Sequence, residues 1–224
     1  MKIKINISNA KAGLIVLLLS SLSLVSCQSS KSVINQVFNQ QEANTINKII
    51  DYYDAYVLSF YKDSIPIDKA YKKFVSFATP VSENTGNLIF LPPQSMQVPF
   101  VKSLDKNSLS ELYFIRDSVK VFDTVIKVPY DFTPNYRGKY IHKYLKKLSK
   151  RNEILEDYYW GMIHLGDVAP TTIAKLMHDY ENFNFNNRDE RFAFISAFFF
   201  SREITETEIY LIENRFKRKP ANDD

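Results

Sequence analysis

Cysteine and glycine are scarce in this chain. Its 224 residues include one cysteine, Cys27, and five glycines. A single cysteine cannot form an internal disulfide, so the fold has to be held together by non-covalent packing. Glycine is needed where a backbone approaches a phosphate or a dinucleotide closely, as in phosphate-cradling loops and Rossmann turns. The shortage of glycine therefore argues against nucleotide-binding folds of these kinds.

Catalytic motifs that can be recognised in a sequence are also missing. There is no G-x-S-x-G segment and no second cysteine to support nucleophilic catalysis. We therefore assign no catalytic residue and expect no cofactor. A hydrolase that acts through two carboxylates stays open, because such pairs are assembled in space rather than in sequence.

Histidine gives only a weak indication of a metal site. The chain has three histidines, and none forms a paired motif such as H-E-x-x-H. His164, Asp167 and His178 would supply three zinc-competent ligands if the end of one helix met the next helix running back. The alternative is surface or helix-terminal histidines, and it is favoured because spacing is the only evidence. We assign no metal site.

The N-terminus has the pattern of an export signal. Basic residues precede an apolar stretch, Gly13 to Val25, that is too short to span a bilayer comfortably. Leu24-Val25-Ser26-Cys27 follows, and it resembles the lipobox of bacterial lipoproteins. The resemblance covers residues 1–27 only. It implies that a diacylglyceryl group is added to the Cys27 thiol and that a peptidase cleaves before it, which makes residues 1–26 a cleaved signal peptide. The alternatives are an ordinary signal peptide with a chance cysteine and an uncleaved anchor helix.

Cleavage changes the charge of the protein. The whole chain carries a formal charge of +4, but without the three signal lysines it holds 26 basic and 25 acidic residues. A near-neutral, exported domain gives no reason to expect nucleic acid as a partner. The expected partner is the membrane, through the two or three acyl chains that anchor a lipoprotein cysteine stably.

The residues after the cysteine indicate where in the cell the protein is located. Gln28 to Lys31 lacks the aspartate that resembles an inner-membrane retention signal, and it lacks the acidic run that resembles a surface-export signal. We therefore expect the bacterial cell envelope, at the periplasmic face of the outer membrane of a two-membrane cell. Residues 27–41 are rich in Ser, Gln and Asn and are predicted to be a lipidated tether. Alternatively, Val33 to Phe38 begins a helix.

Apolar residues recur at helical spacing through most of the mature chain. The segment from Glu42 to Tyr61 is the clearest case, and another helix is predicted from about Asp68. Later helix starts lie about 18 residues apart, which favours antiparallel helices with short loops. We therefore predict a mainly α fold in residues 42–220, with helical hairpins in a bundle or a short α-solenoid-like array. The remaining predicted helices are Tyr136–Ser149, Arg151–Leu165, Pro170–Tyr180, Arg188–Ser201 and Glu206–Lys217.

One helix and one segment depart from this pattern. Arg188–Ser201 is apolar nearly all round, which predicts a central position. Residues 79–134 hold six of the nine prolines and are predicted to be irregular, with a small β-hairpin around Asp123-Thr124. A capping box of Ser108 and Glu111 predicts a short helix from Ser108 to Asp117.

The sharpest local feature is a cluster of basic residues. Residues 137–151 contain seven Lys and Arg and no acid. At about 100° per residue, four of the lysines share one helix face. This face is the candidate binding surface, for anionic headgroups or for another envelope protein. An ordinary solvated face is the alternative, and it is favoured because charge runs on helices are usually solvent faces. The four lysines are Lys139, Lys143, Lys146 and Lys150.

Aromatic residues are the other abundant class, with 17 Phe and 14 Tyr. Tyr158-Tyr159-Trp160 is the richest cluster, and aromatic faces bind sugars and partner chains. Helical spacing nevertheless places at least two of these three side chains in the core. Our first hypothesis is a non-catalytic, lipid-anchored module that binds or assembles with an envelope component. The alternatives are an envelope hydrolase acting on glycan or peptide, and a protective lipoprotein that captures a toxic protein.

Overall fold

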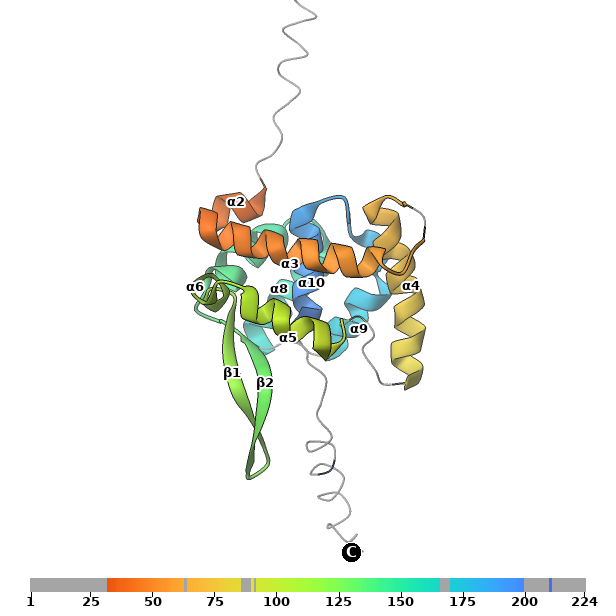
Figure 1. Cartoon of the computed structure of the whole chain (residues 1–224). Coiled ribbons are helices and arrows are strands. Elements are labelled where there is room, and N and C mark those ends of the chain that lie inside the picture. Colours follow the sequence, from red (N-terminus) through yellow and green to blue (C-terminus); the bar gives the residue numbers. More distant parts are fainter. Residues whose placement is uncertain are drawn as a thin grey trace, which may run out of the picture. The chain divides into compact units, whose positions relative to one another are not determined.

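The computed structural model describes residues 32–199 except 63, 86–89, 91 and 166–169, and also describes residue 210. Cys27, the predicted signal peptide and most of the predicted helix Glu206–Lys217 lie outside these residues. Within them the fold is mainly helical with one antiparallel β-hairpin, as predicted (Figure 1). In the described part of the chain, no helix is both long enough and apolar enough to cross a membrane.

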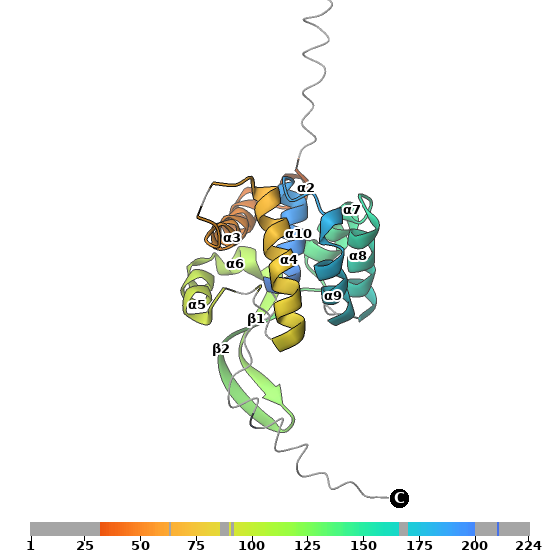
Figure 2. The same cartoon turned by 90° about the vertical axis from the view of Figure 1, so that its right-hand side faces the viewer.

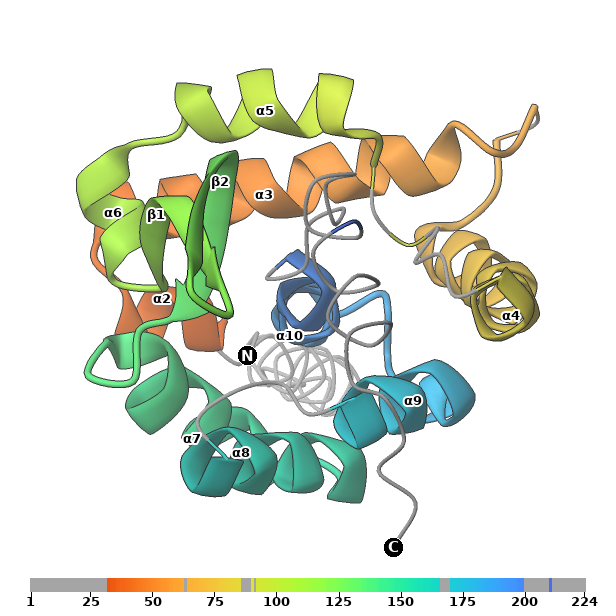
Figure 3. The same ribbon diagram turned by 90° about the horizontal axis from the view of Figure 1, so that it is seen from below.

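Helix α10, Arg188–Phe199, lies at the centre of the other helices. Seen from below, it is surrounded by α2, α3, α4, α7, α8 and α9 (Figure 3). Every residue from Asp189 to Phe198 is buried, including all apolar side chains on all sides of the helix. The prediction that this segment is central is confirmed. Its apolar circumference is the cause, because a helix without a polar face is stable only when other elements cover it.

The N-terminal helices form one flank of this core. In α3 the apolar side chains recur every three or four residues, and Ile46, Ile49 and Ile50 are fully buried. Asn39 and Glu42 form a reciprocal capping box at its start. The first helix, α2, is short and buries Val33 and Ile34 in the same core. These elements are α2, Val33–Val37, α3, Gln40–Leu58, and α4, Ile67–Thr85.

The packed unit therefore begins earlier than the predicted boundary at residue 42. Val33 is the first residue of this unit, and Phe38 is buried after it. The helix that the sequence left as an alternative to a tether is the one observed. The cause is its apolar side chains, which are covered by the core rather than left in solvent.

The middle segment holds two short helices and a hairpin that projects from the helices on the side opposite α2 (Figures 1 and 2). Asp105 caps α6 by accepting a hydrogen bond from the Ser108 N–H at 2.8 Å. The predicted capping box starting at Ser108 was therefore wrong, and residues from Tyr113 onward are strand. The hairpin is confirmed and longer than predicted. The elements are α5, Gln94–Ser103, α6, Lys106–Ser110, β1, Tyr113–Val121, and β2, Thr124–Pro134.

The two strands keep a simple register with one irregularity. Val121 pairs with Thr124 at the turn, and Arg116 pairs with Asp131 nearer the helices. Between these pairs the register shifts, so that Asp117 faces the segment that contains Pro129. A proline lacks the N–H that a regular ladder needs, and a bulge accommodates it.

The remaining helices complete the ring around α10. The helix predicted from Tyr136 begins only at Lys139, and its first turns are π-helical rather than α-helical. The π-helix buries Tyr140, Ile141, Tyr144 and Leu145 on one face. These elements are η1, Tyr140–Leu145, α7, Lys146–Leu148, α8, Glu153–Leu165, α9, Pro170–His178, and η2, Tyr180–Asn182.

Candidate binding site

The four predicted lysines have different surroundings. Lys139 lies 2.6 Å from the carboxylate of Glu42, whose side chain is 8% exposed, so this lysine is part of the packing between η1 and α3. Lys143, Lys146 and Lys150 are exposed, and no described side chain pairs with their ammonium groups. Three of the four lysines are therefore available to a ligand.

A fourth available cation was not included in the predicted face. Lys147 is exposed and donates a hydrogen bond to Gln36 Oε1 at 2.5 Å. Gln36 belongs to α2, so this bond connects α7 to the first helix of the domain. The neutral partner leaves the positive charge of Lys147 uncompensated.

An open groove lies beside these lysines, where α7 ends and α8 begins. Its volume is about 530 Å³. Lys146 and Lys150 line one part of it, and the carboxylates of Glu153 and Glu156 line another. The full lining is Lys146, Ser149, Lys150, Arg151, Asn152, Glu153, Glu156, Tyr159 and Trp160. The groove thus offers both charges and an aromatic face to a ligand.

Trp160 is the aromatic face of this groove. Its side chain is 46% exposed, whereas Tyr158 and Tyr159 are buried in the core. The division of the aromatic cluster into two core residues and one surface residue agrees with the prediction from helical spacing. The Trp160 ring stacks on the ring of His164, with centroids 5.4 Å apart and planes 17° apart. An aromatic side chain that is half exposed beside polar groups suits a binding platform.

Arg151 connects the groove to the start of the domain. Its guanidinium lies 3.2 Å from Asp189 Oδ2 and 3.6 Å from Glu190 Oε1, and both carboxylates are nearly buried. Asp189 also accepts hydrogen bonds from the backbone N–H groups of Val33 and Ile34, at 2.9 and 3.1 Å. One buried carboxylate therefore binds both the first turn of α2 and a residue that lines the groove.

The histidines do not form the arrangement considered from the sequence. His164 lines a hollow of about 290 Å³ together with His142, while His178 contacts Glu83 at 2.7 Å on α4. Asp167 lies outside the described residues. Among the residues that the structure describes, no group of three or more His, Cys, Asp or Glu side chains could hold a metal ion.

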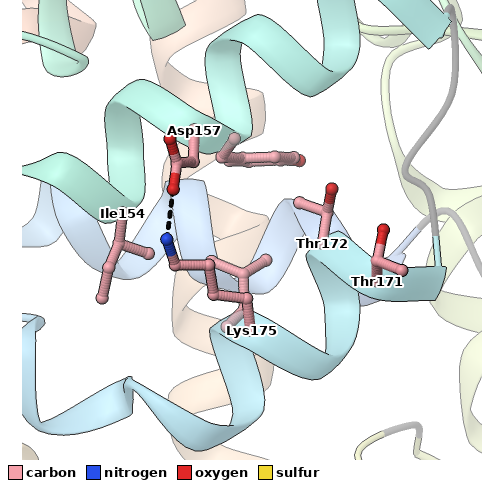
Figure 4. A pocket seen from close by; sticks show the side chains of 7 residues that line it. Ile154, Asp157, Thr171, Thr172 and Lys175 are labelled. Atoms are coloured by element: carbon pink, nitrogen blue, oxygen red, sulfur yellow. Dashed lines mark hydrogen bonds and ion pairs between the residues drawn. The ribbon is translucent and has the colours of Figure 1, made fainter.

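A smaller hollow of about 170 Å³ lies between α8 and α9. Asp157 and Lys175 form an ion pair across it, and Thr171 and Thr172 lie at its other end (Figure 4). The hydrogen bond with Asp157 raises the pKa of Lys175. Because the two charges satisfy each other, this hollow offers less to a ligand than the groove does.

The hairpin is a second exposed surface. Phe114, Ile115, Phe122 and Val125 are between 40% and 68% exposed. Successive side chains of a strand point to opposite faces, so Phe114 and Ile115 expose apolar surface on both sides of the hairpin. Sequence reasoning predicted the hairpin but not the exposure of these side chains, because the sequence does not show that the hairpin projects from the helices (Figure 1).

No protein-family model, no curated protein and no solved structure matches this chain.

Proposed function

We propose that this protein is a lipid-anchored module of the bacterial envelope that binds another envelope component without catalysis. The lipobox-like segment ending at Cys27 supports the anchor. Gln28 to Lys31, which lacks the aspartate of a retention signal and an acidic run, supports the location at the periplasmic face of the outer membrane. The groove between α7 and α8 supports the binding role, and it is the observation that carries the proposal. Its half-exposed Trp160 and unpaired Lys146 and Lys150 suit reversible binding of a charged ligand.

The arrangement of the helices supports a binding role for a rigid scaffold. We infer a single bundle closed around α10 rather than an open solenoid, because one buried helix is shared by the surrounding ones. Residues on such a scaffold keep their relative positions, which favours a pre-formed site. The groove is built from helix ends and one helix face, so it needs no large rearrangement to receive a ligand.

The anchor can be tested independently of the groove. Metabolic labelling with a fatty acid, followed by membrane fractionation, compares the wild type with Cys27→Ala. We expect the wild type to be labelled and to sediment with membranes, and the variant to lose both properties. An unlabelled wild type, or a variant that fractionates like it, would remove the lipoprotein assignment.

The groove is tested by affinity capture from solubilised membranes. Lys146→Glu/Lys150→Glu and Trp160→Ala should lose the component that the wild type captures. The matched controls are Lys102→Glu/Lys120→Glu and Phe77→Ala, which change exposed residues of the same types away from the groove. Lys139 is left unchanged, because its replacement would leave the nearly buried Glu42 carboxylate without a cationic partner. If the groove variants and the control variants capture the same membrane components, the proposal is contradicted.

An envelope hydrolase is the second candidate, and one observation favours it. Glu153 and Glu156 line the same groove as Trp160, so two carboxylates lie beside an aromatic platform that suits a sugar ring. Release of soluble fragments from purified envelope glycan by the wild type, abolished in Glu153→Gln/Glu156→Gln, would establish this alternative. The protective hypothesis needs the same concave charged and aromatic surface, and capture of a toxic protein would identify it.

A further inference from the structure

The lipid anchor limits how far the folded domain can lie from the membrane. This step rests on the proposed lipidation of Cys27. Five residues, 28–32, separate Cys27 from Val33, the first residue of the packed unit. Fully extended, this stretch reaches at most about 20 Å. The start of α2 therefore stays close to the headgroups whatever conformation the linker adopts.

The groove is tied to this same end of the domain by direct contacts. Asp189 binds the Val33 N–H at 2.9 Å and the Arg151 guanidinium at 3.2 Å. Lys147 binds Gln36 of α2 at 2.5 Å. Figure 2 shows α2 and α7 together on the side opposite the hairpin. The lysines of α7 thus lie on the side of the domain that the anchor holds near the membrane.

The charge on this side is positive after its acids are counted. Lys143, Lys146, Lys147 and Lys150 are exposed and form no ion pair with a described carboxylate, while Arg151 pairs with Asp189 and Glu190. Glu153 and Glu156 line the same groove. The four lysines and Arg151 give five positive charges against the four carboxylates of Asp189, Glu190, Glu153 and Glu156, so the net charge is +1. Lysines within a Debye length of an anionic surface are attracted to it, and tryptophan side chains favour the interface between headgroups and water.

We propose that this face binds the anionic headgroups of the membrane that carries the anchor. The lysine ammonium groups contact headgroup phosphates, and Trp160 lies at the level of the headgroups. The lipid on Cys27 supplies the attachment, and the basic face fixes the orientation. In that orientation the hairpin points away from the membrane, because it projects on the side opposite α2 (Figures 1 and 2).

The test uses Trp160 as the reporter, since it is the only tryptophan in the chain. The lipidated protein is reconstituted in vesicles of phosphatidylcholine alone or of an equal mixture with phosphatidylglycerol. We expect a shift of the emission to shorter wavelength and weaker acrylamide quenching in the anionic vesicles only. Both effects should disappear in Lys146→Glu/Lys150→Glu and at high salt, and should persist in Lys102→Glu/Lys120→Glu.

A second measurement gives a magnitude without the acyl chains. In the full mature chain with Cys27→Ala, Lys146→Glu/Lys150→Glu changes the charge of the face by four, which reverses its sign. Each lysine near an anionic surface contributes about 1 kcal/mol to binding. The loss of two positive charges alone therefore corresponds to about 30-fold weaker partitioning into anionic vesicles. We expect at least that loss, and no comparable change for the control pair.

The outcomes separate this inference from the proposed function. Emission that is insensitive to headgroup charge in correctly lipidated protein would overturn the headgroup contact and leave the anchor intact. The same emission shift with soluble glycerol phosphate in place of anionic vesicles would also overturn it, because the groove would then be a site for a free phosphate. Failure of the fatty-acid labelling would instead remove the anchor on which the inference rests.

Discussion

Asp189 is the residue on which the two ends of the described chain meet. Its carboxylate accepts two backbone hydrogen bonds from α2 and faces Arg151, and its own carbonyl accepts a hydrogen bond from the Tyr144 hydroxyl. The side chain is 4% exposed, so solvent cannot replace these partners. A carboxylate with this many buried partners acts as an N-cap supplied by another helix.

Replacement of Asp189 by alanine should therefore destabilise the fold. Two N–H groups and one guanidinium lose their acceptor, and hydrogen bonds to a buried charge contribute about 1.5–3 kcal/mol. We expect the free energy of unfolding in urea to fall by about 3 kcal/mol, with faster hydrogen exchange at Val33 and Ile34. Asp157→Ala is the control, because its ion pair is exposed and such pairs contribute little. Equal stability of the Asp189→Ala protein and the wild type would contradict this role.

Phe122 holds an unfavourable backbone conformation at the hairpin turn. Its φ is 54°, and it is the only non-glycine residue with positive φ in the described chain. A bulky side chain in the left-handed region is strained, whereas asparagine tolerates that region. Phe122→Asn should stabilise the hairpin by about 0.5–1 kcal/mol, measured by hydrogen exchange along β1 and β2. Asp123→Asn makes the same residue type at the neighbouring turn position, and a gain of equal size there would argue against strain at Phe122.

At the scale of elements, the approach of η1 to α6 depends on a single glycine. A Cβ atom built on Gly138 would lie 2.2 Å from the backbone oxygen of Glu111, which cannot move as a side chain can. Gly138→Ala should force the two segments apart and reduce the free energy of unfolding by about 1–3 kcal/mol. The matched control is Gly161→Ala in α8, where the nearest atom is the Thr172 hydroxyl at 3.2 Å.

The two glycine variants should differ because the added methyl group meets a backbone atom at Gly138 and a side-chain atom at Gly161. At Gly161 the added methyl group meets a movable side chain, and alanine is the better helix former by about 1 kcal/mol. We expect little or no loss of stability there. Similar thermal unfolding of both variants would show that the contact between Gly138 and Glu111 does not constrain the packing.

The elements differ in how far the sequence determines them. The helices α3, α8 and α10 follow from regular apolar spacing, which is a local property of the chain. The π-helical turns at Tyr140 do not, because a π-helix and an α-helix share their residue preferences and differ by one inserted residue. The strand from Tyr113 was predicted as part of a helix, because Ser108 and Glu111 have the spacing of a capping box. The observed N-cap is Asp105, so the helix begins at Lys106 and ends at Ser110, early enough for a strand to begin at Tyr113.

At the scale of the whole molecule, the candidate site combines parts that the sequence separates. Lys146 and Lys150 were predicted as part of a binding face, whereas Trp160 was not predicted as a site residue, because its spacing did not show which of the three clustered aromatic side chains stays exposed. The groove that brings them together depends on the turn from α7 to α8. The pairing of Lys139 with Glu42 could not be predicted, since the two residues are 97 positions apart. The contacts of Asp189 with Arg151 and with the Val33 N–H could not be predicted for the same reason. Long-range contacts of this kind decide which members of a charged stripe remain available.

Many of the large side chains in the core are tyrosines, and their ionisation affects the stability of the entire fold. Burial raises the pKa of five of them well above 10, and it raises the pKa of Tyr52 to about 12. In the folded protein these phenols keep their protons more tightly than in the unfolded chain. Their contribution to stability is therefore complete below pH 10 and is lost as the pH rises above it. The five tyrosines are Tyr53, Tyr71, Tyr113, Tyr140 and Tyr144.

This linkage predicts a steep alkaline unfolding transition. Each phenol that stays protonated in the folded protein reduces the free energy of unfolding by at most about 1.4 kcal/mol per pH unit above 10. Several such phenols act together on a domain with about 5–15 kcal/mol of stability, so the fold is lost cooperatively above pH 10. Tyrosinate absorbance and helical circular dichroism should therefore change together in one step. A gradual rise in absorbance with the dichroism unchanged would show that these hydroxyls reach solvent in the folded protein, and that the core around α10 opens without unfolding.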